Sequence, residues 1–320
     1  MEKNQTFVIS GTNDKLWNFQ ELISYLVKNQ RQHISLKINP EAICLETLGI
    51  YRLLDNFEFT QVDIYTENQL EQHSKYNIIV DSHNRWLAQC QPDIPTVLHE
   101  WTGAKTFLSF YHRPTASRLG FASYLYTHHN NASTIHFSYE TDSDRIQLYE
   151  FDKLIAFRLE SSSDVANLLP CMPLYAYDNH EVVEVGTSYK YSRGTGIALY
   201  RDILVDIVSE AHVIGNTFYP TEKSARPMWL KKPFIMFSSR DYLCYMRQMG
   251  FKTFNDFWSE EYDGYEGRDR FNQIIKLIDT LASKSKQELI EMYQGMQSIL
   301  DHNYNMLLNK TYTTTITPIT

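Results

Sequence analysis

The sequence predicts an α/β protein built on mainly parallel sheets. Strand-like apolar runs alternate with amphipathic, helix-like segments over the first hundred residues, which is the pattern of βαβ units. The same order returns in the second part of the chain, after a polar, proline-containing link at 89–95. A chain of 320 residues is also long enough to bury two cores. We therefore expect two facing Rossmann-like domains, 1–98 and 99–310, followed by a tail at 311–320.

In the first half, hydrophobic spacing separates helices from strands. Apolar residues recur at helical spacing over 16–28 and predict a helix there. Pro40 and Glu41 suit the start of a second helix that runs to about residue 56. The predicted strands are 6–10, 33–38, 60–65 and 76–80.

The second half repeats the order of strand, polar turn and helix. Its predicted strands are 105–111, 133–139, 152–159, 203–208 and 233–237, and its predicted helices are 116–127, 243–250, 268–281 and 286–308. Residues 160–192 hold two prolines and are expected to be irregular, and 251–258 is an aromatic loop or strand. The Thr-rich tail has no apolar pattern, so we expect it to be loose.

Composition and charge limit the classes of function. The formal net charge of −8 means that a polyanion such as DNA must be met by a local basic patch. No apolar run approaches the roughly 18 residues of a membrane span, and the N-terminus lacks the apolar region of a secretory signal. We therefore expect a cytoplasmic protein without a membrane span. The four cysteines form no C-x-x-C pair, which argues against a disulfide framework or a zinc site.

The most informative segment is 203–239. An apolar strand ends in Ser209 and Glu210, a turn at 218–220 follows, and Thr221 is a good N-cap for a helix before the next strand begins at Pro233. In an open α/β sheet, strand carboxyl ends and helix N-termini converge on one crevice, where helix dipoles favour phosphate. The order of elements therefore indicates a nucleotide-binding crevice.

Charged residues of this segment suit a nucleotide sugar. Glu210 and Glu222 can accept hydrogen bonds from ribose hydroxyls, and Lys223 and Arg226 can offset the charge of a diphosphate. The alternative is that Thr221, Glu222 and Lys223 only begin a helix, since this tripeptide is common at helix starts.

A second candidate clamp for diphosphate lies between the strand 105–111 and the helix 116–127. Arg113, Thr115, Ser117 and Arg118 offer guanidinium groups and hydroxyls at a helix N-terminus. The alternative is that Thr115 only caps the helix and Arg118 forms a surface ion pair.

Metal-dependent chemistry has only weak support. Asp142-Ser143-Asp144 has the acid-x-acid form that can hold a divalent ion across a diphosphate, but acidic turn residues after a strand are common. The histidines show no zinc-binding spacing, and motifs of serine hydrolases, P-loop kinases and NAD dehydrogenases are missing. We expect no metal and no cofactor besides the nucleotide-sugar donor.

A general base for an acceptor hydroxyl is expected from the first half or from the link. Asp81 and His83 follow the predicted strand 76–80 at its carboxyl end, and His99 and Glu100 lie in the segment between the polar link and the strand 105–111. Each of them could equally be a turn-forming or surface residue.

The segment around 203–239 resembles GT-B-type glycosyltransferases, most closely the fucosyltransferase-like and exostosin-like patterns. The likeness lies in an apolar strand ending in Glu210, an aromatic-x-Thr-Glu-Lys step from Tyr219 to Lys223, and the strand 233–237. In such enzymes the Glu of this step binds the donor ribose and Arg and Lys groups bind the diphosphate. The resemblance assigns these roles to Glu222, Lys223 and Arg118. The Asn that usually follows the strand-end Glu is replaced by Ala211.

The whole chain is also similar to uncharacterised proteins of marine phages, and this resemblance implies a viral setting in the host cytoplasm of an infected cell. Together these features predict a glycosyltransferase that moves a sugar from a nucleotide-diphosphate sugar to the hydroxyl of an acceptor glycan, without an obligatory metal. The alternatives are sugar transfer to modified bases of phage DNA, and a nucleotide- or glycan-binding protein without turnover. The oligomeric state is left open.

Overall fold

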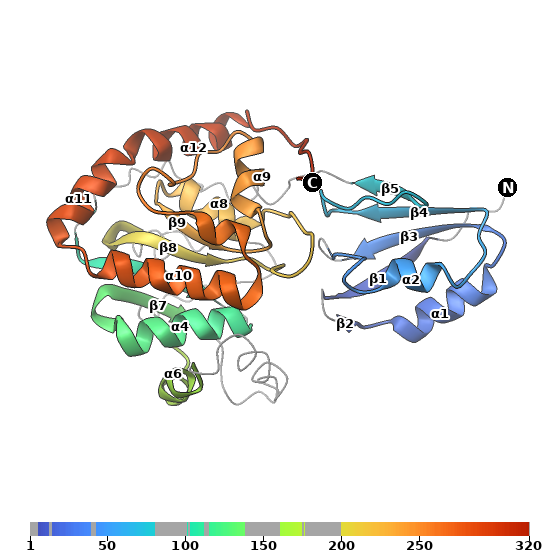
Figure 1. Cartoon of the computed structure of the whole chain (residues 1–320), viewed down its shortest axis with the longest axis horizontal. Coiled ribbons are helices and arrows are strands. Elements are labelled where there is room, and N and C mark those ends of the chain that lie inside the picture. Colours follow the sequence, from blue (N-terminus) through green and yellow to red (C-terminus); the bar gives the residue numbers. More distant parts are fainter. Residues whose placement is uncertain are drawn as a thin grey trace.

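The computed structural model describes residues 6–12, 15–39, 43–80, 101, 103–111, 115–137, 161–174, 176 and 200–319. Within these ranges the chain forms a mixed α/β fold with two sheets of mainly parallel strands, as the sequence predicts. One sheet lies in each half of the molecule (Figure 1). No helix of the described ranges is long and apolar enough to cross a membrane.

The first sheet has the strand order β2-β1-β3-β4-β5. Four of its strands run parallel, and only the short β2 pairs antiparallel with β1. The strand bounds are β1 Phe7–Thr12, β2 Lys15–Leu16, β3 His33–Asn39, β4 Gln61–Thr66 and β5 Asn77–Val80, and the helices are α1 Phe19–Lys28 and α2 Ile50–Leu54. The apolar faces of these elements bury a core of their own around Leu36, Leu54 and Ile64.

The second sheet has the order β7-β6-β8-β9 and all its strands are parallel. The bounds are β6 Lys105–Tyr111, β7 Ser133–Phe137, β8 Ile203–Ser209 and β9 Phe234–Phe237. The chain leaves β6 through α4 (Ala116–His128) to reach β7 on one side, and later returns to β8 on the other side. The strand order therefore reverses between β6 and β8. In open α/β sheets, the carboxyl ends at such a switch point border a crevice where ligands bind.

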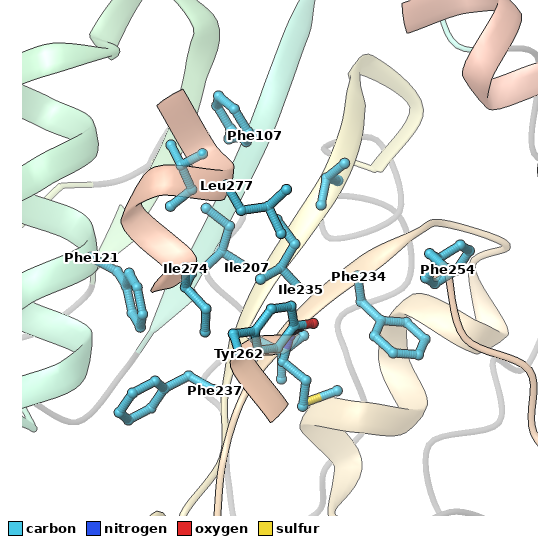
Figure 2. Packing of buried hydrophobic residues seen from close by; sticks show 14 of the residues in the cluster. Phe107, Phe121, Ile207, Phe234, Ile235, Phe237, Phe254, Tyr262, Ile274 and Leu277 are labelled. Carbon is cyan, nitrogen blue, oxygen red and sulfur yellow. Dashed lines mark hydrogen bonds between the residues drawn. The ribbon is translucent and has the colours of Figure 1, made fainter. Parts of the chain in front are cut away.

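Helices cover both faces of the second sheet. The remaining helices are α6 Ser161–Leu168, α8 Glu222–Trp229, α9 Tyr242–Gln248, α10 Gly267–Ala282, α11 Lys286–Gly295 and α12 Gln297–Asn309, with the short 3-10 turns η1 Asn130–Ala132, η2 Leu169–Cys171 and η4 Glu261–Gly264. On one face Phe121 of α4 packs against Phe271 of α10, with ring centroids 4.4 Å apart. Figure 2 shows Phe121, Phe237, Ile207 and Ile274 meeting in this large cluster. Contacts with α8 cover the opposite face, and α12 packs behind α8.

Three predicted segments differ from the structure. Of the helix expected from 40 to 56, the described residues 43–56 form only α2, because Gly49 adopts a left-handed conformation (φ +70°) directly before it. The helix expected over 286–308 ends at Gly295 and resumes at Gln297. A Cβ at Gly295 would lie 2.9 Å from the ring of Phe257, so only glycine permits this approach. The segment expected to be irregular after residue 160 begins with α6.

The prediction of a loose tail is wrong for residues 311–319. The side chain of Gln248 on α9 holds both backbone groups of Thr317, accepting from its N–H at 2.7 Å and donating to its carbonyl at 3.0 Å. The ring of Tyr312 stacks on Phe251, and the N–H of Thr313 donates to the carbonyl of Met249. The tail therefore runs along α9 as an ordered strap, and the sequence missed it because these partners lie about sixty residues earlier.

Lys232, which follows α8, carries an amine buried without a hydrogen-bond acceptor among the described residues. Its Nζ lies 5.0 Å from the centre of the Tyr293 ring. Burial lowers the pKa of Lys232 to about 8, although the charge of Asp202 acts in the opposite direction. In the unfolded chain a lysine has a pKa of about 10.4, so between pH 8 and 10 the unfolded state binds more protons.

We predict that replacing Lys232 with Met stabilises the protein at pH 7, by up to about 3 kcal/mol, because the cost of burying the ammonium disappears. The free energy of unfolding of the wild type should rise between pH 8 and 10, and that of Lys232→Met should not. Chemical denaturation at several pH values measures both. Lys231→Met, at the neighbouring half-buried position whose amine is paired with Asp301, serves as the control. Parallel pH profiles of wild type and Lys232→Met would contradict the assignment.

Candidate functional site

Glu210 lies directly after β8, at the switch point of the second sheet, and it is almost fully buried. Its Oε1 accepts hydrogen bonds from the backbone N–H of Thr221 at 3.2 Å and from the hydroxyls of Ser224 and Tyr242. Its Oε2 accepts from the Thr221 hydroxyl at 2.6 Å and from the N–H of Ala211 at 3.3 Å. A buried carboxylate is stable only when donors of this kind replace water.

These contacts give Glu210 a structural task in place of the predicted contact with ribose. Both oxygens are already occupied by donors from the start of α8 and from α9. Burial and the charge of Glu210 raise the pKa of Tyr242 well above its usual value, so Tyr242 stays a neutral donor. Glu210 therefore anchors the N-terminus of α8 to the end of β8.

Asp206 lies four residues earlier on the same face of β8 and holds the other end of α8. Arg226 donates to Asp206 Oδ2 from Nη2 at 3.1 Å, and Tyr200 donates its hydroxyl to the same oxygen. The guanidinium group lies 4.9 Å from the Phe110 ring centre, and the Arg226 side chain is only 7% exposed. Arg226, predicted to bind diphosphate, is thus committed to a buried ion pair beneath the helix.

The residues predicted at the start of α4 contact the end of β8 from the other side of the switch point. Thr115 is the N-cap of α4, as one of the two sequence interpretations predicts, and it accepts from the N–H of Arg118 at 3.5 Å. The hydroxyl of Ser117 lies 3.0 Å from that of Ser209. Arg118 is buried and donates from Nη2 to the carbonyl of Ser209 at 3.1 Å. Its guanidinium group therefore ties α4 to the end of β8, and it is not the surface ion pair of the alternative interpretation.

Glu222 and Lys223 occupy the first turn of α8, immediately after the N-cap Thr221. Lys223 Nζ lies 2.7 Å from Glu222 Oε1, and the side chains are 24% and 13% exposed, respectively. Burial favours a higher pKa for Glu222, but the charge of Lys223, its hydrogen bond and the charge of Arg226 outweigh this and lower the pKa. Glu222 is therefore a carboxylate at neutral pH, and both side chains retain some contact with solvent.

Tyr219, the aromatic residue of the predicted motif, contacts the first half. Its hydroxyl donates to Glu67 Oε2 at 2.6 Å, and Glu67 directly follows β4. The neighbouring Asn68 also hydrogen-bonds to the segment that leads into α8. The carboxyl end of β4 thus meets the segment between β8 and α8.

Some predicted site residues lie outside the described ranges. These are the base candidates Asp81, His83, His99 and Glu100, the clamp residue Arg113, and the acid pair Asp142 and Asp144. Within the described ranges, no group of three or more His, Cys, Asp or Glu side chains is arranged to hold a metal ion.

An open, acidic pocket lies next to α9, between η4 and Ile319 of the tail. Two of its carboxylates, those of Asp263 and Glu260, are hydrogen-bonded within the fold. Asp263 accepts from the N–H groups of Leu243 and Cys244 at the start of α9 and from Arg270. Glu260 likewise accepts from Arg247 and from the N–H of Phe254. We therefore do not include this pocket in the candidate site.

Sequence reasoning missed the partners that hold the site together. They are Asn68, Tyr200, Asp206, Ser209, Ser224 and Tyr242. One signal was present for Asp206, because an acid within the otherwise apolar run of β8 requires a buried partner. The spacing of Asp206 and Glu210 also places both acids on one face of the strand.

Comparison of the chain with known family models, curated proteins and solved structures finds no match. The resemblance to GT-B-type glycosyltransferases therefore stays a prediction from the residues of the 203–239 segment.

We predict that Arg226→Met destabilises the protein by roughly 3–5 kcal/mol, because it leaves the Asp206 carboxylate buried without its cation. The double variant Asp206→Asn/Arg226→Met should be more stable than Arg226→Met alone. Urea denaturation at pH 7 measures both values, and Arg240→Met at a largely exposed position is the control. If Arg226→Met is as stable as the control, the structural role of this pair is wrong.

Proposed function

We propose that the protein is a glycosyltransferase that binds a nucleotide-diphosphate sugar at the N-terminus of α8 and transfers the sugar to an acceptor hydroxyl. One observation carries this proposal. The partly exposed Glu222–Lys223 pair lies on the first turn of α8, beside the switch point between β6 and β8. This is the edge of an open α/β sheet where nucleotides bind.

The chemistry of this turn suits a nucleotide diphosphate. Lys223 supplies a positive charge, and the positive end of the helix dipole adds to it, which favours a diphosphate. Glu222 is an ionised acceptor and suits ribose hydroxyls. Lys223 and the N–H groups at the start of α8 can also stabilise the leaving nucleotide diphosphate, so the proposed reaction needs no obligatory metal.

The position of Glu210, Arg118 and Arg226 changes which residues we assign to the donor. These three side chains are buried and bonded within the fold, so they act by holding α8 and α4 at the switch point. Direct donor contacts are assigned to Glu222 and Lys223. Thr221 supports them as the cap whose hydroxyl accepts from the N–H of Lys223 at 3.2 Å.

The contact between the halves supports an acceptor site on the first half. The end of β4 meets the segment before α8, so an acceptor held by the first sheet would lie close to the donor turn. This arrangement is what two facing Rossmann-like domains require, and it favours them as our interpretation of the fold. Asp81 follows β5 in the sequence and stays a candidate base, together with His83 and Glu100.

We predict that Lys223→Gln weakens donor binding by roughly ten- to hundredfold, because a charged hydrogen bond to phosphate is worth about 1.5–3 kcal/mol. A thermal-shift screen of UDP-, GDP-, ADP-, CMP- and dTDP-sugars identifies the donor first, since a bound ligand stabilises the native state. Isothermal titration calorimetry then compares the variants. Lys231→Gln, just beyond the other end of α8, is the matched control and should bind like the wild type.

Two results would count against the proposal. The first is that no nucleotide sugar stabilises the protein, and the second is that Lys223→Gln binds the donor as tightly as Lys231→Gln. Binding without hydrolysis or transfer of the donor would instead favour a nucleotide- or glycan-binding protein.

A further inference from the structure

Asn68 is a fully buried side chain at the end of β4, and its amide bonds to both halves of the molecule. Its Oδ1 accepts from the N–H groups of Leu70 and Phe218, each at 3.1 Å. Its Nδ2 donates to Glu71 Oε2 and to the carbonyl of Asn216, each at 3.0 Å. The amide is therefore satisfied by two bonds within the first half and two to the second half.

Other contacts reinforce this junction, which we call the Asn68 clasp (residues 67–70 with 215–219). The N–H of Gln69 donates to the carbonyl of Phe218 at 3.3 Å, and Leu70 packs in the core of the second half. Gly215 has φ +77°, and a Cβ there would lie 2.3 Å from Thr47 Oγ1 in the first half. The two halves thus meet without room for a larger side chain.

The clasp lies next to the candidate site along the chain and through side chains. Phe218 is followed after two residues by Thr221, the cap of α8. The Phe218 ring also lies 5.0 Å from the ring of Tyr242, whose hydroxyl donates to Glu210. The second half holds the segment as well, because the Ser239 hydroxyl donates to the carbonyl of Thr217.

We propose that Asn68 is a positioning residue that makes the order of the first turn of α8 depend on the docking of the first half. When the halves separate locally, the segment 216–219 loses its partners for the N–H and carbonyl of Phe218 and the carbonyl of Asn216. Thr221 then loses part of the support that holds it on Glu210. Docking of the first half thereby assembles the turn that carries Glu222 and Lys223. The expected effect on ligand binding rests on the proposed donor site. The dependence of the order of this turn on the docking of the first half does not.

Hydrogen exchange tests the coupling without a ligand. The reporters are the N–H groups of Thr221, Lys223 and Ala225, whose acceptors in the native state are Glu210, the Thr221 hydroxyl and the Thr221 carbonyl. In Asn68→Ala we expect these groups to exchange at least about tenfold faster, because two hydrogen bonds across the clasp are lost.

Asn303→Ala is the matched control for this experiment. Asn303 is equally buried, and its amide makes the same kind of paired bonds, to the N–H and carbonyl of Lys252, each at 2.8 Å. The Asn303→Ala variant should destabilise the fold without selectively increasing hydrogen exchange at residues 221–225. Equal exchange of the reporters in Asn68→Ala and Asn303→Ala, after correction for global stability, overturns the proposal.

Tyr219→Phe keeps the test decisive if Asn68→Ala does not fold. This variant retains the ring and removes the hydrogen bond from the Tyr219 hydroxyl to Glu67. We expect roughly threefold faster exchange of the same reporters. No selective change at residues 221–225 in Tyr219→Phe counts against the coupling.

Titration with inorganic pyrophosphate separates this inference from the proposed function. If both hold, pyrophosphate binds the wild type and Asn303→Ala alike, and Asn68→Ala binds it several-fold more weakly. Absence of pyrophosphate binding in the wild type removes the support for the donor site, and the exchange result still decides the coupling. Equal affinity of Asn68→Ala and Asn303→Ala overturns the claim that the clasp assembles the anion-binding turn.

Discussion

The arrangement of the second half depends on the buried carboxylate of Glu210. A carboxylate removed from water is stable only if several donors surround it, and here they come from Thr221, Ser224 and Tyr242. These donors belong to the cap of α8, the body of α8 and the start of α9. Because all of them must reach one group at the end of β8, the positions of both helices relative to the sheet are set together.

The charged side chains at β8 and at the start of α8 fall into two groups, those bonded within the fold and those in contact with solvent. Asp206 and Glu210 point to one face of β8 and hold α8 at both ends, and Arg118 fastens α4 to the carbonyl of Ser209. These three groups are buried and hydrogen-bonded within the protein, and Asp206 is also paired with Arg226, so their bonding capacity is used by the fold. Glu222 and Lys223 differ because their side chains bond to each other and to the cap, and they retain contact with solvent. This difference in burial, rather than residue type, is what selects the two as candidate ligand contacts.

The two halves have separate hydrophobic cores, and among the residues that the structure describes they meet at the Asn68 clasp. Most of the cross-half contacts described above converge on Asn68 and on the segment that leads into α8, and Leu70 reaches into the core of the second half. The first turn of α8, which carries the proposed ligand site, therefore begins only a few residues after the segment that hydrogen-bonds to the first half.

The sequence by itself determined the α/β class, the extents of β6 and β8 to within a residue, and the capping of α8 by Thr221. These features follow from local rules, because the spacing of apolar residues and the preference for Thr at a cap act over a few neighbouring residues. Only the tertiary structure decided that Glu210 and Arg226 are buried partners, that Asn68 joins the halves, and that the tail docks on α9. The partners in these contacts are 11 to 150 residues apart in the chain. Periodicity shows which face of a strand or helix is buried, but it does not show which distant group that face will meet.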